Sequence, residues 1–125
     1  MSEPIVFISH FGLKDGALEG FREMQREAVP QLEADKPRTL AFLYYLDEAG
    51  SEISIVHLFA DADSMDAHFE GAAERAGRAY EYLVPRGWEI YGRPSPTALE
   101  TMRRSAATAA VPLTLRPTYE AGFLR

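Results

Sequence analysis

Residues 52–70 read EISIVHLFADADSMDAHFE, and this stretch decides the fold. Residues 53–59 are mostly β-branched, aromatic or aliphatic, which is typical of a buried strand. The acidic turn that follows offers Asp61, Asp63 and Ser64 as alternative N-caps for an amphipathic helix, and negative charge suits a helix N-terminus. We therefore expect a buried strand that leads through a short turn into a helix.

The chain on either side of this stretch repeats the same plan. The patterns predict strands at residues 4–11, 39–46 and 88–92, and helices at residues 17–34 and 64–83. The polar segment at residues 47–52 is short and contains Gly50, so it predicts a hairpin between two antiparallel strands. The resulting order is βαββαβ, an α+β ferredoxin-like arrangement with two helices on one face of an antiparallel sheet. We assign this domain to residues 1–93.

A C-terminal extension of residues 94–125 follows the domain. Pro94 and Pro96 mark its start. Its pattern predicts a short helix at residues 97–107 and an extra strand at residues 111–116. Packing of this extension on a dimer partner is one arrangement open to it.

The predicted strands are apolar on both faces. Residues 5–8 read IVFI and residues 40–46 read LAFLYYL, without the alternation expected of a sheet that is wet on one side. Two helices cover only one face of the sheet. The pattern therefore favours a homodimer in which two sheets pack face to face and close a dimeric α/β barrel. The alternative is a monomer whose C-terminal extension folds over the open face.

Composition and charge narrow the classes of partner. The net charge is −6 and the basic residues are scattered, so we expect no nucleic-acid partner. The chain has no cysteine, which excludes disulfides and thiolate sites. The N-terminal residues lack the features of a signal peptide, and no apolar run approaches the length of a bilayer span. We therefore expect a cytoplasmic protein without a membrane partner.

The histidines are the first candidates for chemistry. His10 ends the first predicted strand, His57 lies in the third, and His68 lies in the first turns of the second helix. Each is suited to act as a general base near neutral pH. The alternative for His10 and His57 is a hydrogen-bonded core histidine without a catalytic role.

Aromatic residues with one polar atom form a second group. Tyr44, Trp88 and Tyr91 fall on the second and fourth predicted strands. Such side chains line pockets for flat hydrophobic ligands, although they also occur as ordinary core residues. The acidic turn lacks the glycine and the final glutamate of a calcium loop, and no compact histidine and carboxylate pattern predicts a metal site.

The decisive stretch resembles the antibiotic biosynthesis monooxygenase family of dimeric α/β barrel proteins. Members of that family share a strand, an acidic turn and then an A-x-H-[LF] helix start, here residues 60–64 followed by DAHF at residues 66–69. The segment AVPQLEADKP at residues 28–37 is also similar to the family pattern. The resemblance implies a cavity between sheet and helices. It also implies oxygen insertion into an aromatic polyketide or quinol without metal or flavin, or oxidative opening of haem.

The family signatures are incomplete in this chain. Matched without gaps, the haem-degrading branch has its tryptophan and iron ligand at Phe59 and Arg78, which disfavours haem. At the positions where the polyketide-tailoring branch has its catalytic residues, this chain has Ile55, Phe59 and Met65 instead, so that catalytic set is absent.

We therefore expect a cofactor-independent monooxygenase, without metal, that acts on a small aromatic or quinol-like substrate. A non-catalytic small-molecule binding protein and an aromatic isomerase or cyclase remain alternatives on the same fold. The candidate residues are His68 and His57 for catalysis, and Tyr44, His10, Trp88 and Tyr91 for substrate binding.

Overall fold

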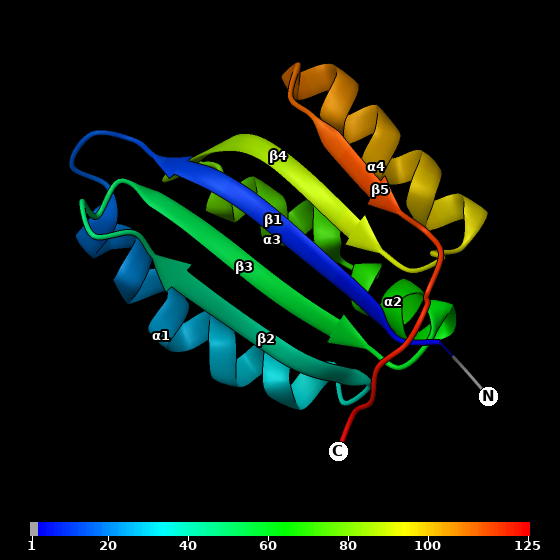
Figure 1. Ribbon diagram of the computed structural model, residues 1–125. Coiled ribbons are helices and arrows are strands. Elements are labelled where there is room, and N and C mark those ends of the chain that lie inside the picture. Colours follow the sequence, from blue (N-terminus) through cyan, green and yellow to red (C-terminus); the bar gives the residue numbers. More distant parts are fainter. Residues whose placement is uncertain (1–2) are drawn as a thin grey trace.

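The computed structural model describes residues 3–125 (Figure 1). In chain order the elements are β1 (Ile5–Leu13), α1 (Leu18–Asp35), β2 (Thr39–Leu46), β3 (Glu52–Phe59), α2 (Ala62–Phe69), α3 (Ala72–Ala79), β4 (Leu83–Tyr91), α4 (Pro96–Ala109) and β5 (Leu113–Arg116). The five strands form one sheet in the order β2-β3-β1-β4-β5. Neighbouring strands are antiparallel except β4 and β5, which are parallel. This arrangement confirms the predicted α+β ferredoxin-like fold.

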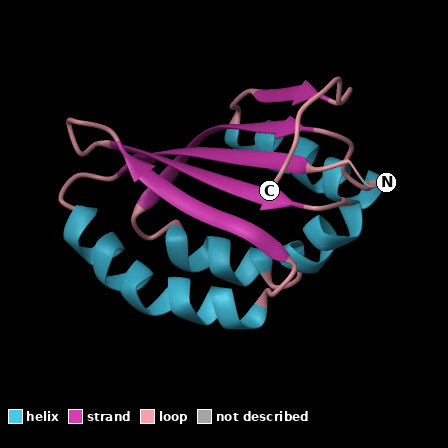
Figure 2. Cartoon of the chain, turned by 60° about the horizontal axis from the view of Figure 1, so that its bottom comes forward, coloured by secondary structure: helices cyan, strands magenta, loops and turns pink. Residues whose placement is uncertain are grey.

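The helices lie on one side of the sheet and leave its other side uncovered by helix (Figures 1 and 2). On β1 and β3 the burial alternates, so every second residue points into the helix-covered side. Those residues form the core together with Phe21 of α1 and Met65 of α2, which are almost completely buried. Burial of each such side chain contributes about 1.5–3 kcal/mol.

A carboxylate fixes the hairpin between β2 and β3. Asp47 accepts hydrogen bonds from the backbone N–H groups of Ser51 (2.8 Å) and Glu52 (3.0 Å), and these bonds lower its pKa. Gly50 adopts a φ of 72°, which glycine reaches without strain. The short polar turn therefore sets the register in which His57 lies opposite Phe42.

The helical segment after β3 is two helices, and the prediction of one helix over residues 64–83 was wrong. Helix α2 begins where the Asp61 side chain accepts a hydrogen bond from the Ser64 N–H (2.8 Å). It ends at Glu70, whose backbone is extended, and Gly71 is left-handed with a φ of 77°. The Arg75 guanidinium donates to the Glu70 carbonyl (2.9 Å) and so holds the break.

Strand β4 starts at Leu83, before the predicted start at Trp88. Pro85 lies beside a register shift at His10 and Phe11, where the ladder is irregular. Proline is compatible with a strand at such a bulge. The strand therefore extends by five residues and places Trp88 next to Ser9 of β1.

The C-terminal extension continues the same layers. Ser95 caps α4 by accepting a hydrogen bond from the Ala98 N–H (3.1 Å), and its hydroxyl donates to Asp66 of α2 (2.6 Å). Helix α4 buries Ala98, Met102 and Ala106, and β5 then pairs with β4 of its own chain. Residues 117–125 are all exposed.

Two glycines offer a matched test of this backbone. Gly92 has a φ of 104°, and a Cβ there would lie 2.8 Å from the Pro4 carbonyl oxygen. We expect Gly92→Ala to lower the free energy of unfolding by about 2 kcal/mol or more, because the strain and the clash add. In α3 a Cβ on Gly77 meets no atom within 4 Å. Gly77→Ala should therefore raise that free energy by up to about 1 kcal/mol, since alanine is the better helix former. Urea denaturation of both variants measures the difference, and an equal effect would contradict it.

Within residues 3–125, no helix has both the length and the apolar character that a bilayer span requires.

Candidate functional site

A cavity of about 330 Å³ lies between the sheet and the helices. Its apolar wall combines side chains from strands and helices. These include Phe7, Phe11, Met24, Phe42, Ile55, Phe69, Trp88 and Met102. Such a concave apolar space with a few polar groups is the usual form of a small-molecule site.

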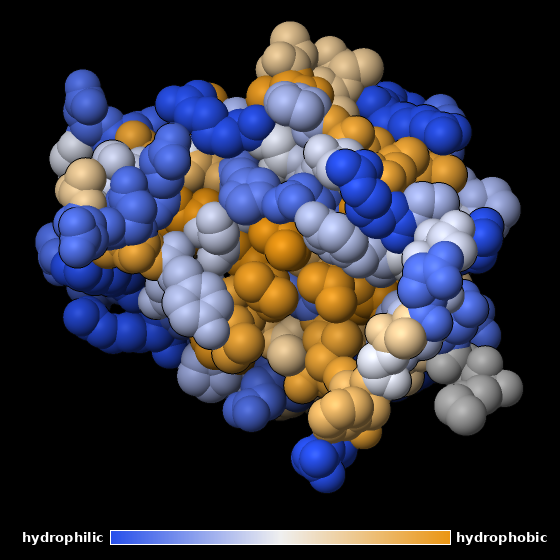
Figure 3. Space-filling view, in the orientation of Figure 1, coloured by the Kyte–Doolittle hydropathy of each residue, from blue (hydrophilic) through white to orange (hydrophobic). Residues whose placement is uncertain are grey.

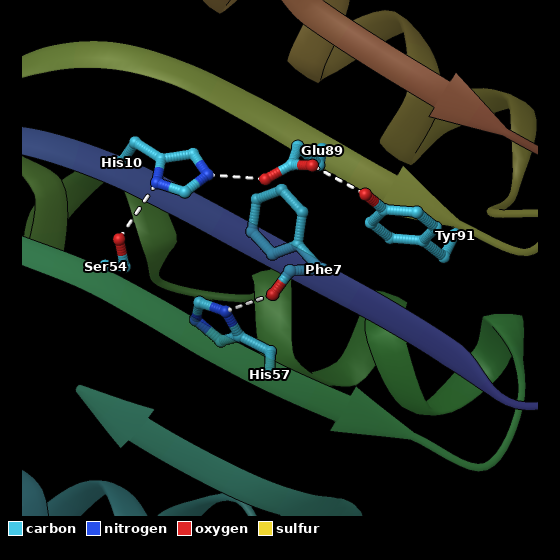
Figure 4. A network of polar contacts seen from close by, with 6 residues as sticks. All are labelled: Phe7, His10, Ser54, His57, Glu89 and Tyr91. Carbon is cyan, nitrogen blue, oxygen red and sulfur yellow. Dashed lines mark hydrogen bonds and ion pairs between the residues drawn. The ribbon is translucent and has the colours of Figure 1, made fainter. Parts of the chain in front are cut away.

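His57 projects into this cavity from the middle of β3. Its Nδ1 lies 3.0 Å from the Phe7 carbonyl oxygen (Figure 4). Since a carbonyl only accepts, Nδ1 carries the proton, and Nε2 of the neutral ring is an acceptor. The side chain is 5% exposed, and this burial lowers the pKa of His57 to about 4. His57 is therefore neutral at pH 7, and its unprotonated Nε2 is free to accept a hydrogen bond from a ligand.

His68 reaches the same space from α2. Its Nδ1 lies 2.7 Å from the Thr39 hydroxyl oxygen, and its ring lies edge to face with that of His57 at 5.1 Å. Burial lowers the pKa of His68 to about 3, and the protonated form of His57 and the positive charges of Arg75 and Lys36 act in the same direction. Two neutral histidines therefore stand side by side in the cavity.

Ser9 and Gln25 add further polar groups. Both line the cavity and are buried, yet their side chains make no hydrogen bond within residues 3–125. In this part of the chain no fully enclosed side-chain nitrogen or oxygen lacks a partner. The unpartnered polar atoms of Ser9, Gln25 and the two histidines therefore keep some accessible surface, on residues that line the cavity. Together they offer a ligand several hydrogen-bonding positions within an apolar wall.

The structure brings three of the six predicted site residues together. His57, His68 and Trp88 line the cavity. Tyr44 lies on the helix-covered side but packs edge to face against Phe21, with ring centroids 5.9 Å apart, outside the cavity. Sequence reasoning missed Ser9 and Gln25. Gln25 could have been found, because it is a polar residue among the apolar positions of α1.

His10 and Tyr91 lie on the opposite face of the sheet (Figure 4). His10 contacts the Ser54 hydroxyl through Nδ1 at 2.9 Å and the Glu89 carboxylate through Nε2 at 2.5 Å. The Tyr91 hydroxyl donates to the same carboxylate at 2.6 Å. The bonds from His10 and then Tyr91 lower the pKa of Glu89. These residues form a polar network that is separate from the cavity.

Within residues 3–125, no three histidine, aspartate or glutamate side chains gather as a candidate metal-ligand cluster.

Comparisons with known proteins place this geometry in a structural group. No family model matches the chain, and no curated protein matches it. Among solved structures, MupZ from Pseudomonas fluorescens is similar with a TM-score of 0.74 and 16% identity, over 99% of this chain and 96% of MupZ. SnoaB from Streptomyces nogalater, a cofactor-independent oxygenase, is similar with a TM-score of 0.60 and 12% identity, over 76% of this chain and 99% of SnoaB. A Bacteroides thetaiotaomicron protein, named provisionally as an antibiotic biosynthesis monooxygenase, has a TM-score of 0.56 and 13% identity, over 65% of this chain and 80% of its own.

The fold is that of the antibiotic biosynthesis monooxygenases. This finding confirms the structural resemblance expected from residues 60–69. The likeness to MupZ spans almost the whole chain and so includes α4 and β5. The C-terminal helix and strand are therefore part of an architecture that occurs in a second protein.

Proposed function

We propose that this protein is a cofactor-independent monooxygenase that oxidises a small aromatic or quinol-like substrate. The observation that carries the proposal is the pair of neutral histidines, His57 and His68, in the apolar cavity. SnoaB, an oxygenase that works without a cofactor, has the same fold and supports the reaction class.

In this mechanism the protein supplies a base and a shaped, water-poor space. The Nε2 atom of His57 or His68 removes a proton from the activated carbon or hydroxyl of the substrate. The resulting electron-rich anion reacts directly with molecular oxygen. One oxygen atom becomes the new carbonyl of the product, and the other leaves as water with the two hydrogens of an original CH₂ group. Ser9 and Gln25 orient polar groups of the substrate, and Trp88 packs against its ring.

We also propose that the active form is a homodimer joined through the open face of the sheet. That face carries aliphatic and aromatic residues on three adjacent strands, and Figure 3 shows them as an apolar area with a polar surround. They are Val6 and Ile8 of β1, Leu43 and Tyr45 of β2, and Val56 and Leu58 of β3. Leu43 and Tyr45 are 47% and 59% exposed, so residues 117–125 do not cover this part of the face. A second copy of the sheet has the matching apolar surface.

Oxygen consumption tests the reaction. The purified protein, given a series of anthrones and quinols, should consume oxygen with at least one of them. His68→Ala should lower kcat by about a hundredfold or more, because it removes a base from the cavity. Arg26→Gln is the matched control, since Arg26 lies on the exposed surface of α1, outside both the cavity and the open face of the sheet. Unchanged uptake in His68→Ala would contradict the role of His68, and no uptake by the wild-type protein with any substrate would contradict the monooxygenase.

A second candidate is an isomerase or cyclase that uses the same histidines without oxygen. Its support comes from the positions that the polyketide-tailoring branch fills with polar residues. Ile55 lines the cavity, while Phe59 and Met65 are fully buried in the core and do not line it. Rearrangement of substrate under nitrogen, lost in His68→Ala, would favour this candidate over oxygen insertion. Binding without either reaction would indicate a small-molecule carrier.

A further inference from the structure

The charge inside the cavity is opposite in sign to the charge of the whole chain. The sequence has 19 acidic and 13 basic residues apart from histidine. Yet the residues that line the cavity include Arg75 and Arg78 and not one aspartate or glutamate. An apolar space whose only formal charges are two guanidinium groups favours a ligand with a negative group.

Both arginines come from α3, one turn apart, and neither forms an ion pair within residues 3–125. Arg75 is partly buried and donates to the carbonyl oxygens of Glu70 and His68, which fixes its position. A guanidinium has five N–H donors, so donors remain for a ligand. Burial, and then the positive charge of Arg78, lower the pKa of Arg75. The two cations are therefore close enough to repel each other, and an anion between them would relieve that repulsion.

The arginines also mark the way into the cavity. A second, more polar hollow between α1 and α3 shares Ala28, Leu32, Arg75 and Arg78 with the cavity wall. Lys36 lines this outer hollow, where its Nζ donates to the Ala67 carbonyl (2.8 Å). Asp35 and Glu74 line it too, but they do not line the inner cavity. The boundary between the two spaces is therefore basic, and the apolar space and the histidines lie behind it.

From this arrangement we infer that the natural ligand is an amphiphilic acid, with an apolar or aromatic body in the cavity and one carboxylate held between Arg75 and Arg78. The inference deepens the proposed function, because it names the substrate class for the same site. The carboxylate would enter last and remain at the mouth, and the body would reach His57 and His68. Paired hydrogen bonds from guanidinium to carboxylate fix orientation as well as affinity.

The protein has a built-in reporter for this binding. Trp88 is its single tryptophan and lines the cavity. The probes are phenylbutanoate and phenylbutanamide, which share an aromatic body and differ in the charge of the head group. Neither absorbs where tryptophan is selectively excited. We expect phenylbutanoate to change the Trp88 fluorescence with a Kd about tenfold lower than that of phenylbutanamide, a difference of about 1.4 kcal/mol.

Arg78→Gln is the informative variant, because Arg78 is exposed and makes no hydrogen bond through its side chain within residues 3–125. It should weaken phenylbutanoate binding about tenfold and leave phenylbutanamide unchanged. Arg78→Lys keeps the positive charge but loses the paired hydrogen bonds, so it should retain only part of the preference for the acid. Arg26→Gln, on the exposed surface of α1, is the matched control and should change neither Kd.

Three results would overturn the inference: equal affinity of the wild-type protein for acid and amide, equal weakening of both by Arg78→Gln, or no Trp88 response to phenylbutanoate up to its solubility. The binding measurement needs no turnover, so it is independent of the reaction. Acid preference without oxygen uptake would remove the monooxygenase and keep the ligand class. Rapid oxidation of a neutral quinol that is unaffected by Arg78→Gln would keep the monooxygenase and remove the proposed ligand class.

Discussion

Replacing Val56 with glutamate is expected to convert the protein from a dimer into a monomer. Val56 lies in the middle of the open face, directly between Ile8 of β1 and Leu43 of β2. A carboxylate there would lose its water when a second sheet packs on it, and none of the apolar neighbours offers a partner. Leaving one charge buried without a partner costs about 3–5 kcal/mol. The dimer dissociation constant should therefore rise at least about a hundredfold.

Light scattering after gel filtration measures this change over a range of concentrations. Gly77→Glu is the control, because it adds the same charge on α3, at a position where a Cβ meets no atom within 4 Å. That variant should keep the mass of the wild-type protein. A wild-type monomer at every concentration, or a Val56→Glu dimer as tight as the wild type, would contradict the proposed sheet-to-sheet interface.

Acid should destabilise the protein well above the range in which carboxylates titrate. The pKa values of His57 and His68 fall from an ordinary 6.5 to about 4 and about 3 in the folded chain. A group with a lowered pKa in the folded state stabilises the fold fully above its unfolded value. That stabilisation is lost as the pH falls from 6.5 toward the folded value. Each histidine should therefore lower the free energy of unfolding by about 2 kcal/mol as the pH falls from 6.5 to about 4.5.

Urea denaturation at several pH values between about 7.5 and 4.5 measures the slope. The double variant His57→Asn with His68→Asn is the matched test, because the asparagine amide can donate or accept a hydrogen bond in place of the histidine Nδ1 but does not titrate. The free energy of unfolding of this variant should be lower than that of the wild type at pH 7, and it should change little as the pH falls to about 4.5. Asp47, Asp61 and Glu89 also have lowered pKa values. The stabilisation that these carboxylates contribute is therefore lost only below about pH 4.5. A wild-type stability that stays constant down to pH 5 would show that the two histidines are not buried as neutral rings.

The element order could be predicted because the local signals agree with the tertiary fold. Residues 53–59 are a continuous apolar run, and the cap at Asp61 has the hydrogen bonds that its position predicts. The break at Gly71 could not be predicted in the same way. Glycine also occurs inside helices, and the bond from Arg75 to the Glu70 carbonyl that accompanies the left-handed turn is not visible in the local pattern.

The site was less predictable than the fold, because a cavity depends on which side chains meet across several elements. His57 and His68 were candidates on residue type alone, but their contact requires the register of β3 and the placement of α2 on the sheet. Tyr44 shares a sheet face with His57 and still lies outside the cavity, since α1 places Phe21 against it. The periodicity of the sequence predicts which face of the sheet a residue occupies. It does not predict which helix packs over that residue.

Helix α4 forms a part of the cavity wall whose residues can be substituted separately from the histidines. Thr101, Met102 and Ser105 of this helix line the space, while the histidines come from β3 and α2. The part of the wall that α4 contributes is thereby separate from the elements that carry the histidines, and α4 follows all of those elements in the chain. Diversifying three positions on one helix would change which molecules fit without disturbing the sheet. For protein engineering, the fold is therefore a scaffold in which the α4 part of the cavity wall can be varied separately from the elements that carry His57 and His68.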